Sequence, residues 1–217
     1  AETYQERSNL KKEKGDLAGA LADAGAAHAQ DATVTYARLV ADVLSQQGKT
    51  DEALAMLEPF ELSGDEEIDL MLARADIMGE GGRKDAGWAL LGEAEAMRPG
   101  DADVLNAQCW FMGNWSYRLD DAKAVCDKAV TVSSYGAAAL DSRALVHYRV
   151  GDRAAARSDL QAALISAPDQ STSRYLRGLI ALDEGQTADG ERDIAAATRL
   201  YGGIEAYFAR FGLGRAK

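Results

Sequence analysis

The chain has 217 residues, which is enough for one large domain or two small ones. Apolar residues make up 47% of it, so a sizeable core can be buried, and strand-favouring β-branched and aromatic residues are sparse. The net charge of −11 argues against nucleic acid and disfavours anionic lipid as partners, because both select basic surfaces. The composition therefore favours an all-α protein. The negative charge permits a neutral or basic partner, or it serves only to keep the protein soluble.

The start of the chain, Ala1-Glu-Thr-Tyr4, is polar and lacks the apolar core of a signal peptide. No apolar run approaches the roughly 20 residues that a membrane-spanning helix needs. We therefore expect no membrane insertion. We also expect either that a leader has been removed or that the chain is a piece of a longer protein.

One pattern recurs along the chain. Gly15, Gly48, Gly82, Gly151 and Gly185 each end one helical pattern just before another, at intervals of 33, 34, 69 and 34 residues, and Tyr117 stands where a glycine is missing. Five positions after each of the six comes a small residue: Ala20, Ala53, Gly87, Ala122, Ala156, Gly190. Four positions further comes a residue that is mostly aliphatic: Ala24, Leu57, Leu91, Cys126, Leu160, Ile194.

This spacing predicts helical hairpins. The recurring residues lie on one helix face, where the small residue lets two helices approach closely and the larger one fills the gap. Glycine at the turn permits a left-handed backbone, and Gly48-Lys-Thr-Asp51 and Gly151-Asp152 supply N-capping oxygens. A single hairpin cannot bury its apolar face, so the hairpins are expected to stack.

In chain order, the pattern predicts six hairpins and a C-terminal cap. Their expected ranges are 1–33, 34–67, 68–102, 103–136, 137–170 and 171–204, with the cap over 205–217. Pro59 falls inside the second helix of the second hairpin, where it should end or kink that helix. Trp110 makes the fourth hairpin irregular, since the other hairpins carry a smaller residue there.

The period of about 34 residues, with Gly, Ala, an aliphatic residue, Ala and then Pro99 or Pro168, resembles the tetratricopeptide repeat (TPR) family. The resemblance implies a right-handed α-solenoid of about six TPR-like hairpins, folded as a single domain over residues 1–217. It implies a protein or peptide partner, held in a concave groove that the first helix of each hairpin lines. The oligomeric state does not follow from it.

Carried onto this chain, the groove positions give ten candidate partner-binding residues: Arg38, Asp42, Asp76, Phe111, Asn114, Trp115, Asp141, Tyr148, Arg149 and Tyr175. The middle of this groove is acidic, and its C-terminal half is aromatic beside Arg149. Exposed aromatic residues next to an arginine have the composition of an interface hot spot. The alternative is that Phe111 and Tyr175 pack between adjacent repeats.

The two cysteines, Cys109 and Cys126, occupy facing positions in the fourth hairpin. Counted from the first residue of the hairpin, 103, Cys109 is at position 7 and Cys126 at position 24. In an antiparallel hairpin that turns near position 15 or 16, the positions of two facing residues sum to about 31, and the two cysteines satisfy this. We therefore predict a disulfide, provided that the compartment is oxidising. The alternative is a pair of buried thiols that act as small apolar residues.

A second resemblance surrounds the cysteines. Leu105-Asn-Ala-Gln-Cys-Trp110 and Asp121-Ala-Lys-Ala-Val-Cys-Asp127, with matching runs up to Leu213, look like the C-terminal TPR tail of bacterial cell-envelope proteins that carry an upstream transglutaminase-like domain. The resemblance covers residues 104–213. It implies a periplasmic or other cell-envelope location, with the cytoplasm as the alternative, and a non-catalytic accessory tail as the alternative function.

The sequence offers no catalytic constellation. We find no nucleotide, metal or haem motif, so no cofactor is expected, and His28 and His147 lie too far apart to cooperate. The acidic runs Asp65-Glu-Glu67 and Asp120-Asp121 fit helix starts, where they interact favourably with the helix dipole. We therefore predict a protein-interaction module and not an enzyme.

Overall fold

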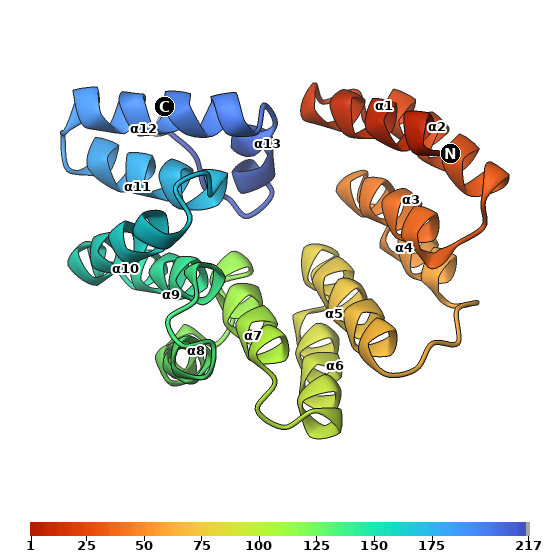
Figure 1. Cartoon of the computed structure of the whole chain (residues 1–217), viewed down its shortest axis with the longest axis horizontal. Coiled ribbons are helices and arrows are strands. Elements are labelled where there is room, and N and C mark those ends of the chain that lie inside the picture. Colours follow the sequence, from red (N-terminus) through yellow and green to blue (C-terminus); the bar gives the residue numbers. More distant parts are fainter. Residues whose placement is uncertain (216–217) are drawn as a thin grey trace. The chain divides into compact units, whose positions relative to one another are not determined.

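The computed structural model describes residues 1–215, and within them the chain is all-α, with thirteen helices and no strand (Figure 1). The last two residues of the predicted cap, 216–217, lie outside the described part. The helices form an α-solenoid of six antiparallel hairpins followed by a short final helix, as the sequence predicts. The hairpins are α1 (Glu2–Glu13) with α2 (Leu17–Gln30), α3 (Val34–Gln46) with α4 (Thr50–Leu57), α5 (Asp65–Glu80) with α6 (Lys84–Met97), α7 (Ala102–Asn114) with α8 (Leu119–Val132), α9 (Ala137–Arg149) with α10 (Arg153–Ser166), and α11 (Ser171–Asp183) with α12 (Thr187–Leu200); the final helix is α13 (Ile204–Ala209).

The chain divides into two compact units, and the division falls within α6. The first unit is Ala1–Ala94, and the second begins at Glu95. In the first unit α1, α3 and α5 contact one another in sequence, and in the second α7, α9 and α11 do the same. Folding as one domain over residues 1–217 stays a prediction.

The turn glycines do what the pattern predicts. Gly15 and Gly151 have φ angles of 76° and 84°, a left-handed conformation that costs glycine little. Where Tyr117 replaces the glycine, Ser116 and Arg118 on either side of it take positive φ values instead, at 47° and 46°. The fourth hairpin therefore turns with two residues in a conformation that side chains disfavour.

Helix capping follows the prediction at some turns and not at others. Asp152 accepts a hydrogen bond from the main-chain N–H of Ala155, as predicted. The expected cap at Gly48-Lys-Thr-Asp51 is wrong, because α4 begins at Thr50 and its N-cap is Lys49, whose side chain has no acceptor. The acidic runs do begin helices, in the first turns of α5 and α8.

The repeated small and aliphatic residues form the core of the hairpins. Ala53 and Leu57 in the first unit, and Ala156 and Leu160 in the second, are completely buried. The helix α4 ends at Leu57, two residues before Pro59, as the position of the proline predicts. The pattern in the sequence therefore identifies the contact surface between the two helices of each hairpin.

A salt bridge recurs inside three hairpins, always between residues 16 apart. Arg7 bonds Asp23, Arg143 bonds Asp159 and Arg177 bonds Asp193, each through two nitrogen atoms of the guanidinium. Two parallel bonds fix the geometry of such a pair as well as its charge. The bridge joins the first helix of a hairpin to the second.

In the fourth hairpin a disulfide, and not this salt bridge, joins the two helices. Cys109 occupies the position of the arginine, eight residues before the turn, and it is bonded to Cys126 with a Cα–Cα distance of 4.9 Å. Both residues are completely buried. The predicted disulfide is confirmed in the structure, and the two sulfur atoms join α7 to α8.

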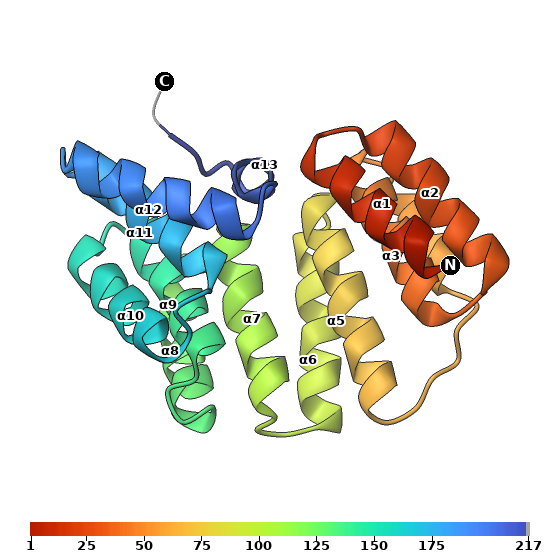
Figure 2. The same ribbon diagram turned by 45° about the horizontal axis from the view of Figure 1, so that its top comes forward.

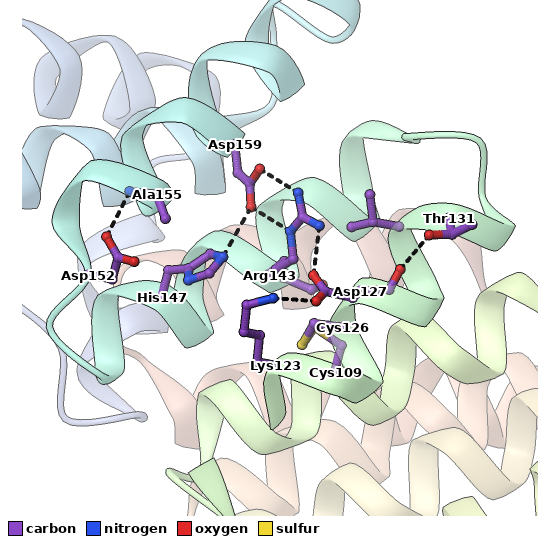
Figure 3. A network of polar contacts seen from close by, with 12 residues as sticks. Cys109, Lys123, Cys126, Asp127, Thr131, Arg143, His147, Asp152, Ala155 and Asp159 are labelled. Carbon is purple, nitrogen blue, oxygen red and sulfur yellow. Dashed lines mark hydrogen bonds and ion pairs between the residues drawn. A yellow bond between two sulfur atoms is a disulfide. The ribbon is translucent and has the colours of Figure 1, made fainter. Parts of the chain in front are cut away.

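The disulfide-bonded hairpin is tied to its neighbour by charge. Figure 3 shows Arg143 between two carboxylates, with Asp159 on one side and Asp127 of α8 on the other, the latter at 2.9 Å. His147 is buried beside this network, with its Nε2 3.8 Å from the carboxylate of Asp159. Hydrogen bonds to these carboxylates raise the pKa of the Arg143 guanidinium, so the arginine remains charged between the hairpins.

Candidate protein-interaction surface

The inner face of each unit is defined here as the surface formed by its first helices, α1, α3 and α5 in the first unit and α7, α9 and α11 in the second. All ten predicted partner-binding residues lie on these helices or, for Trp115, directly after α7. The structure separates the ten residues into two groups with different surroundings. Three belong to the first unit and seven to the second.

In the first unit the predicted residues are polar and accessible. Arg38 is exposed on α3 and makes no ion pair with any residue between 1 and 215. Asp42, one turn further along, accepts hydrogen bonds from Lys12 at 2.6 Å and Gln46 at 3.0 Å. Asp76 is partly buried on α5. This inner face therefore presents both signs of charge.

In the second unit most of the predicted residues are buried. Phe111, Asn114, Trp115, Asp141 and Tyr175 are between 1% and 7% exposed. The expectation that the aromatic residues are exposed is therefore wrong, because other side chains cover them. The ring of Phe111 meets that of Tyr117 edge-on, with 5.8 Å between their centroids.

Asp141 has a structural role in this arrangement. Its carboxylate accepts hydrogen bonds from the hydroxyl groups of Thr172, at 2.7 Å, and Ser173, at 2.5 Å, and so ties α9 to the start of α11. Burial raises the pKa of Asp141, and the hydroxyl donors partly oppose this rise. The side chain has no surface to offer a partner.

Tyr148 is half-buried and faces the next hairpin. Its hydroxyl donates to the carboxylate of Asp183 at 2.9 Å, and Arg153 contacts the same carboxylate at 3.2 Å. Burial, followed by the bond to Asp183, raises the pKa of Tyr148 to about 12. The hydroxyl therefore remains a donor at neutral pH.

Arg149 binds main-chain carbonyl groups and no carboxylate of the residues described. Its Nε donates to the carbonyl of Gly113 at 2.9 Å, and its Nη2 donates to those of Asn114 at 3.0 Å and Phe211 at 2.6 Å. Two of these carbonyls end α7, where the helix leaves them without intrahelical partners. Burial lowers the pKa of the guanidinium. Arg149 thus joins α7 to the last residues described.

The covering residues form one stretch, 204–213, which we call the C-terminal segment. Its Phe208 packs against Tyr175, with 4.7 Å between ring centroids, and its Phe211 meets Trp115 edge-on at 5.0 Å. Its Tyr207 stacks on Trp110 at 6.5 Å. Figure 2 shows α13, in dark blue, near the end of α7. The C-terminal segment therefore covers the part of the inner face of the second unit formed by Trp115, Arg149 and Tyr175, where a partner was expected.

Trp110, Tyr207, Phe208 and Phe211 belong to this surface and are not among the ten residues that the repeat pattern predicts. The pattern marks Trp110 only as an irregularity of its hairpin and places the other three in the cap. A signal was present, because Tyr207, Phe208 and Phe211 place three aromatic side chains within five residues of a chain with only 7% aromatic content. The sequence could not predict the surface against which these three side chains pack.

Other kinds of site are absent from residues 1–215. Within residues 1–215, no three His, Cys, Asp or Glu side chains come together as metal ligands. None of the helices described is both long enough and apolar enough to cross a membrane. Cys109 has no thiol for nucleophilic chemistry with His147, because its sulfur is bonded to Cys126.

Comparison with known proteins supports the fold. Neither the protein-family models nor the curated proteins compared with the sequence contain a match. Among solved structures, a thermophilic TPR protein of Thermus thermophilus is similar, with 18% identity and a TM-score of 0.63 over 82% of this chain and 97% of that one. PilW, described as a widely conserved type IV pilus biogenesis factor, has 18% identity and a TM-score of 0.59 over 82% of each chain.

A tetratricopeptide repeat protein from Parabacteroides merdae is similar over most of the length. It has 19% identity and a TM-score of 0.56, with 96% of this chain and 87% of that one covered. At such identities the likeness concerns the fold. The chain therefore has the α-solenoid fold of TPR proteins, and its function has to be argued from its own residues.

Proposed function

We propose that this chain is a protein-interaction module that holds a segment of a partner polypeptide on the inner faces of its hairpins. One observation carries the proposal: the inner face of the second unit already holds ten residues of polypeptide, the C-terminal segment. Aromatic rings of the inner face pack against Phe208 and Phe211 of this segment, and Arg149 donates a hydrogen bond to the main-chain carbonyl of Phe211. Stacked helical repeats offer extended surfaces suited to this type of recognition.

The inner face of the first unit is the proposed site for the partner. Arg38 is exposed and presents a planar group with five donors, which suits a carboxylate or a main-chain carbonyl. Asp42, whose carboxylate already accepts from Lys12 and Gln46, and Asp76 add negative charge on α3 and α5. A partner segment with both an acidic and a basic or neutral polar residue would complement this surface.

The experiment is cross-linking from two matched positions. A photoreactive residue replaces Arg38 on α3 in one bait and Arg192 on α12, a second helix, in the other; both native side chains are exposed. Incubation with a cell extract should yield a cross-linked partner from position 38 only. In parallel, Arg38→Glu should weaken capture of that partner about tenfold, equivalent to about 1.4 kcal/mol, whereas Arg192→Glu should leave it unchanged.

Three results would contradict the proposal. A partner that cross-links only from position 192 would place the interface on the second helices. Equal capture by the Arg38→Glu and Arg192→Glu variants would remove Arg38 from the interface. The absence of any partner at either position would count against an interaction module.

A second proposal concerns the compartment, and it rests on the Cys109–Cys126 disulfide. Disulfides persist in oxidising compartments, so we propose the periplasm or another part of the cell envelope and not the cytoplasm. Thiol titration of unreduced, denatured protein should find no free thiol. Two thiols would contradict the disulfide in the cell and remove the support for this location.

In a cell envelope, the alternative function is a non-catalytic accessory tail of a transglutaminase-like enzyme. The support for it is the similarity of residues 104–213 to such tails together with the disulfide. A reading frame that encodes a Cys-His-Asp domain upstream of this chain would support the alternative. A frame that encodes only this chain would contradict it.

A further inference from the structure

We infer that the C-terminal segment occupies a recognition site for a partner segment with two aromatic residues three positions apart, which binds the second unit in its place. The inference rests on the proposed function and adds the chemistry of the partner. Phe208 and Phe211 are the aromatic pair that the site now holds. The partner segment would present an equivalent pair.

The receiving surface is composed like an interface hot spot. Trp110 and Trp115 come from α7 and the residue after it, Arg149 ends α9, and Tyr175 lies on α11. Tryptophan, tyrosine and arginine are the residues that most often dominate binding energy, particularly where they are shielded from water. Three helices of three successive hairpins thus converge on one stretch of ten residues.

The contacts with the C-terminal segment can be reproduced by another polypeptide. Phe208 packs on Tyr175 and Phe211 on Trp115, and Tyr207 adds a stack on Trp110. The single bond from Arg149 goes to a main-chain carbonyl that every residue has. The recognition therefore requires the spacing of two aromatic side chains and an accessible carbonyl at the second. Any segment that meets these conditions can make the contacts of Phe208, Phe211 and the Phe211 carbonyl.

The C-terminal segment is also attached in a way that permits release. The helix α13 has six residues, too few to be stable as a helix away from the surface. Gly202 and Gly203 connect it to α12, and no disulfide holds it, since the chain's two cysteines bond each other. The ion pairs of Arg215 with Glu191 and Glu205 are exposed, and such pairs contribute little.

The test uses a labelled synthetic peptide with the sequence of residues 203–213 and the full 217-residue chain. The wild-type chain is compared with a full-length variant that carries Phe208→Ala and Phe211→Ala, which removes the two rings from the attached segment and leaves the receiving surface unchanged. The variant should bind the peptide at least about tenfold more tightly than the wild type. The attached segment competes in the wild type at an effective concentration in the millimolar range.

Two controls define specificity. A peptide with alanine at both phenylalanine positions should bind neither protein. Adding Arg149→Ala to the doubly substituted chain should abolish binding of the original peptide. Failure of the doubly substituted chain to bind the original peptide, with its helical content and disulfide intact, would overturn the inference.

Hydrogen exchange of the wild-type chain provides a measurement that does not depend on a variant. The amides of residues 204–213 should exchange faster than those in the middle of α11, because the segment opens locally. Equal protection of the two would overturn the inference by showing that the segment is a permanent part of the core. Exchange of the segment between two copies, seen as a wild-type dimer, would also overturn it in favour of a second copy as occupant.

The proposed function is tested separately. Cross-linking from position 38 reports on the first unit and does not involve the C-terminal segment. A cross-linked partner together with absent peptide binding would refute this inference alone. Peptide binding without a partner at position 38 would refute the proposed site in the first unit and leave the second.

Discussion

The inner faces of the two units place different side chains at the same positions of the repeat. Arg38 in the first unit and Tyr175 in the second both lie ten residues before a turn glycine, Gly48 and Gly185 respectively. Arg38 is exposed to solvent, whereas Tyr175 is 1% exposed beneath Phe208. The backbone therefore gives equivalent positions, and the chemistry of the side chain decides whether a position is left open or covered.

The difference shows how one repeat can carry two kinds of surface. Charged side chains such as Lys12 and Asp42 pair with each other and stay partly hydrated, so the first inner face is stable without a cover. Exposing aromatic rings to water costs free energy, so a segment that covers the second inner face stabilises the folded unit.

Loss of the disulfide should have the largest effect, and it should be confined to the second unit. Replacing Cys109 and Cys126 with alanine opens a loop that the bond closes across a separation of 17 residues. Closing a loop of this size contributes about 3 kcal/mol to the free energy of unfolding. Urea denaturation should show the lower free energy of unfolding, and hydrogen exchange should show reduced protection of the amides in α7 and α8.

The amides of α1 and α3 serve as the internal control for this variant. They belong to the other unit and should exchange at their wild-type rates. An equal loss of protection in α1 and α3 would show that the two units unfold together. The contrast between the units would then not extend to their stability.

The second largest loss of stability is expected for Arg149→Ala, and Arg38→Ala serves as its comparison. Arg149→Ala leaves three carbonyls without their donor, those of Gly113, Asn114 and Phe211, and should cost about 2 kcal/mol of stability. Arg38→Ala removes an exposed side chain and should change stability by less than about 0.5 kcal/mol. Thermal unfolding of both variants measures the difference.

A conservative variant refines this comparison. Arg149→Lys keeps the charge but lacks the planar fork, so it should recover only part of the loss. Full recovery would mean that charge alone stabilises this site. Similar costs for Arg149→Ala and Arg38→Ala would contradict the structural role of Arg149.

Two buried aspartates should give the smallest effect, with opposite dependence on pH. In the first unit, hydrogen bonds from Arg7 and Lys11 hold the pKa of Asp23 well below its usual range. Its contribution to stability is present above the unfolded pKa of about 3.9 and is lost as the pH falls through the folded value. The variant Asp23→Asn should therefore be less stable than the wild type at pH 7, and the gap should close in acid.

In the second unit, burial raises the pKa of Asp141, so the sign is reversed. The folded state favours the protonated carboxyl, and stability falls as the pH rises from about 3.9 through the folded pKa. Relative to the wild type, Asp141→Asn should therefore gain stability between acid and neutral pH. Urea midpoints of both variants between about pH 3 and 7 measure the two slopes, and slopes of the same sign would contradict these assignments.

The sequence by itself determined the helical hairpins and what lies between their two helices. Ala156 and Leu160 follow the repeat and are completely buried, and Cys109 and Cys126 face each other and are bonded. These features could be predicted because they arise within one hairpin. The period of the helix and the glycine turn fix which residues meet over so short a distance along the chain.

Only the tertiary structure decided the state of the inner faces. Arg149 and Trp115 lie where the repeat pattern places them, but their partner Phe211 comes from the C-terminal segment, 62 residues beyond Arg149. No local pattern encodes where such a distant segment will pack. The physical reason is that burial depends on all the surfaces that approach a residue, whereas sequence periodicity reports only the helix on which that residue lies.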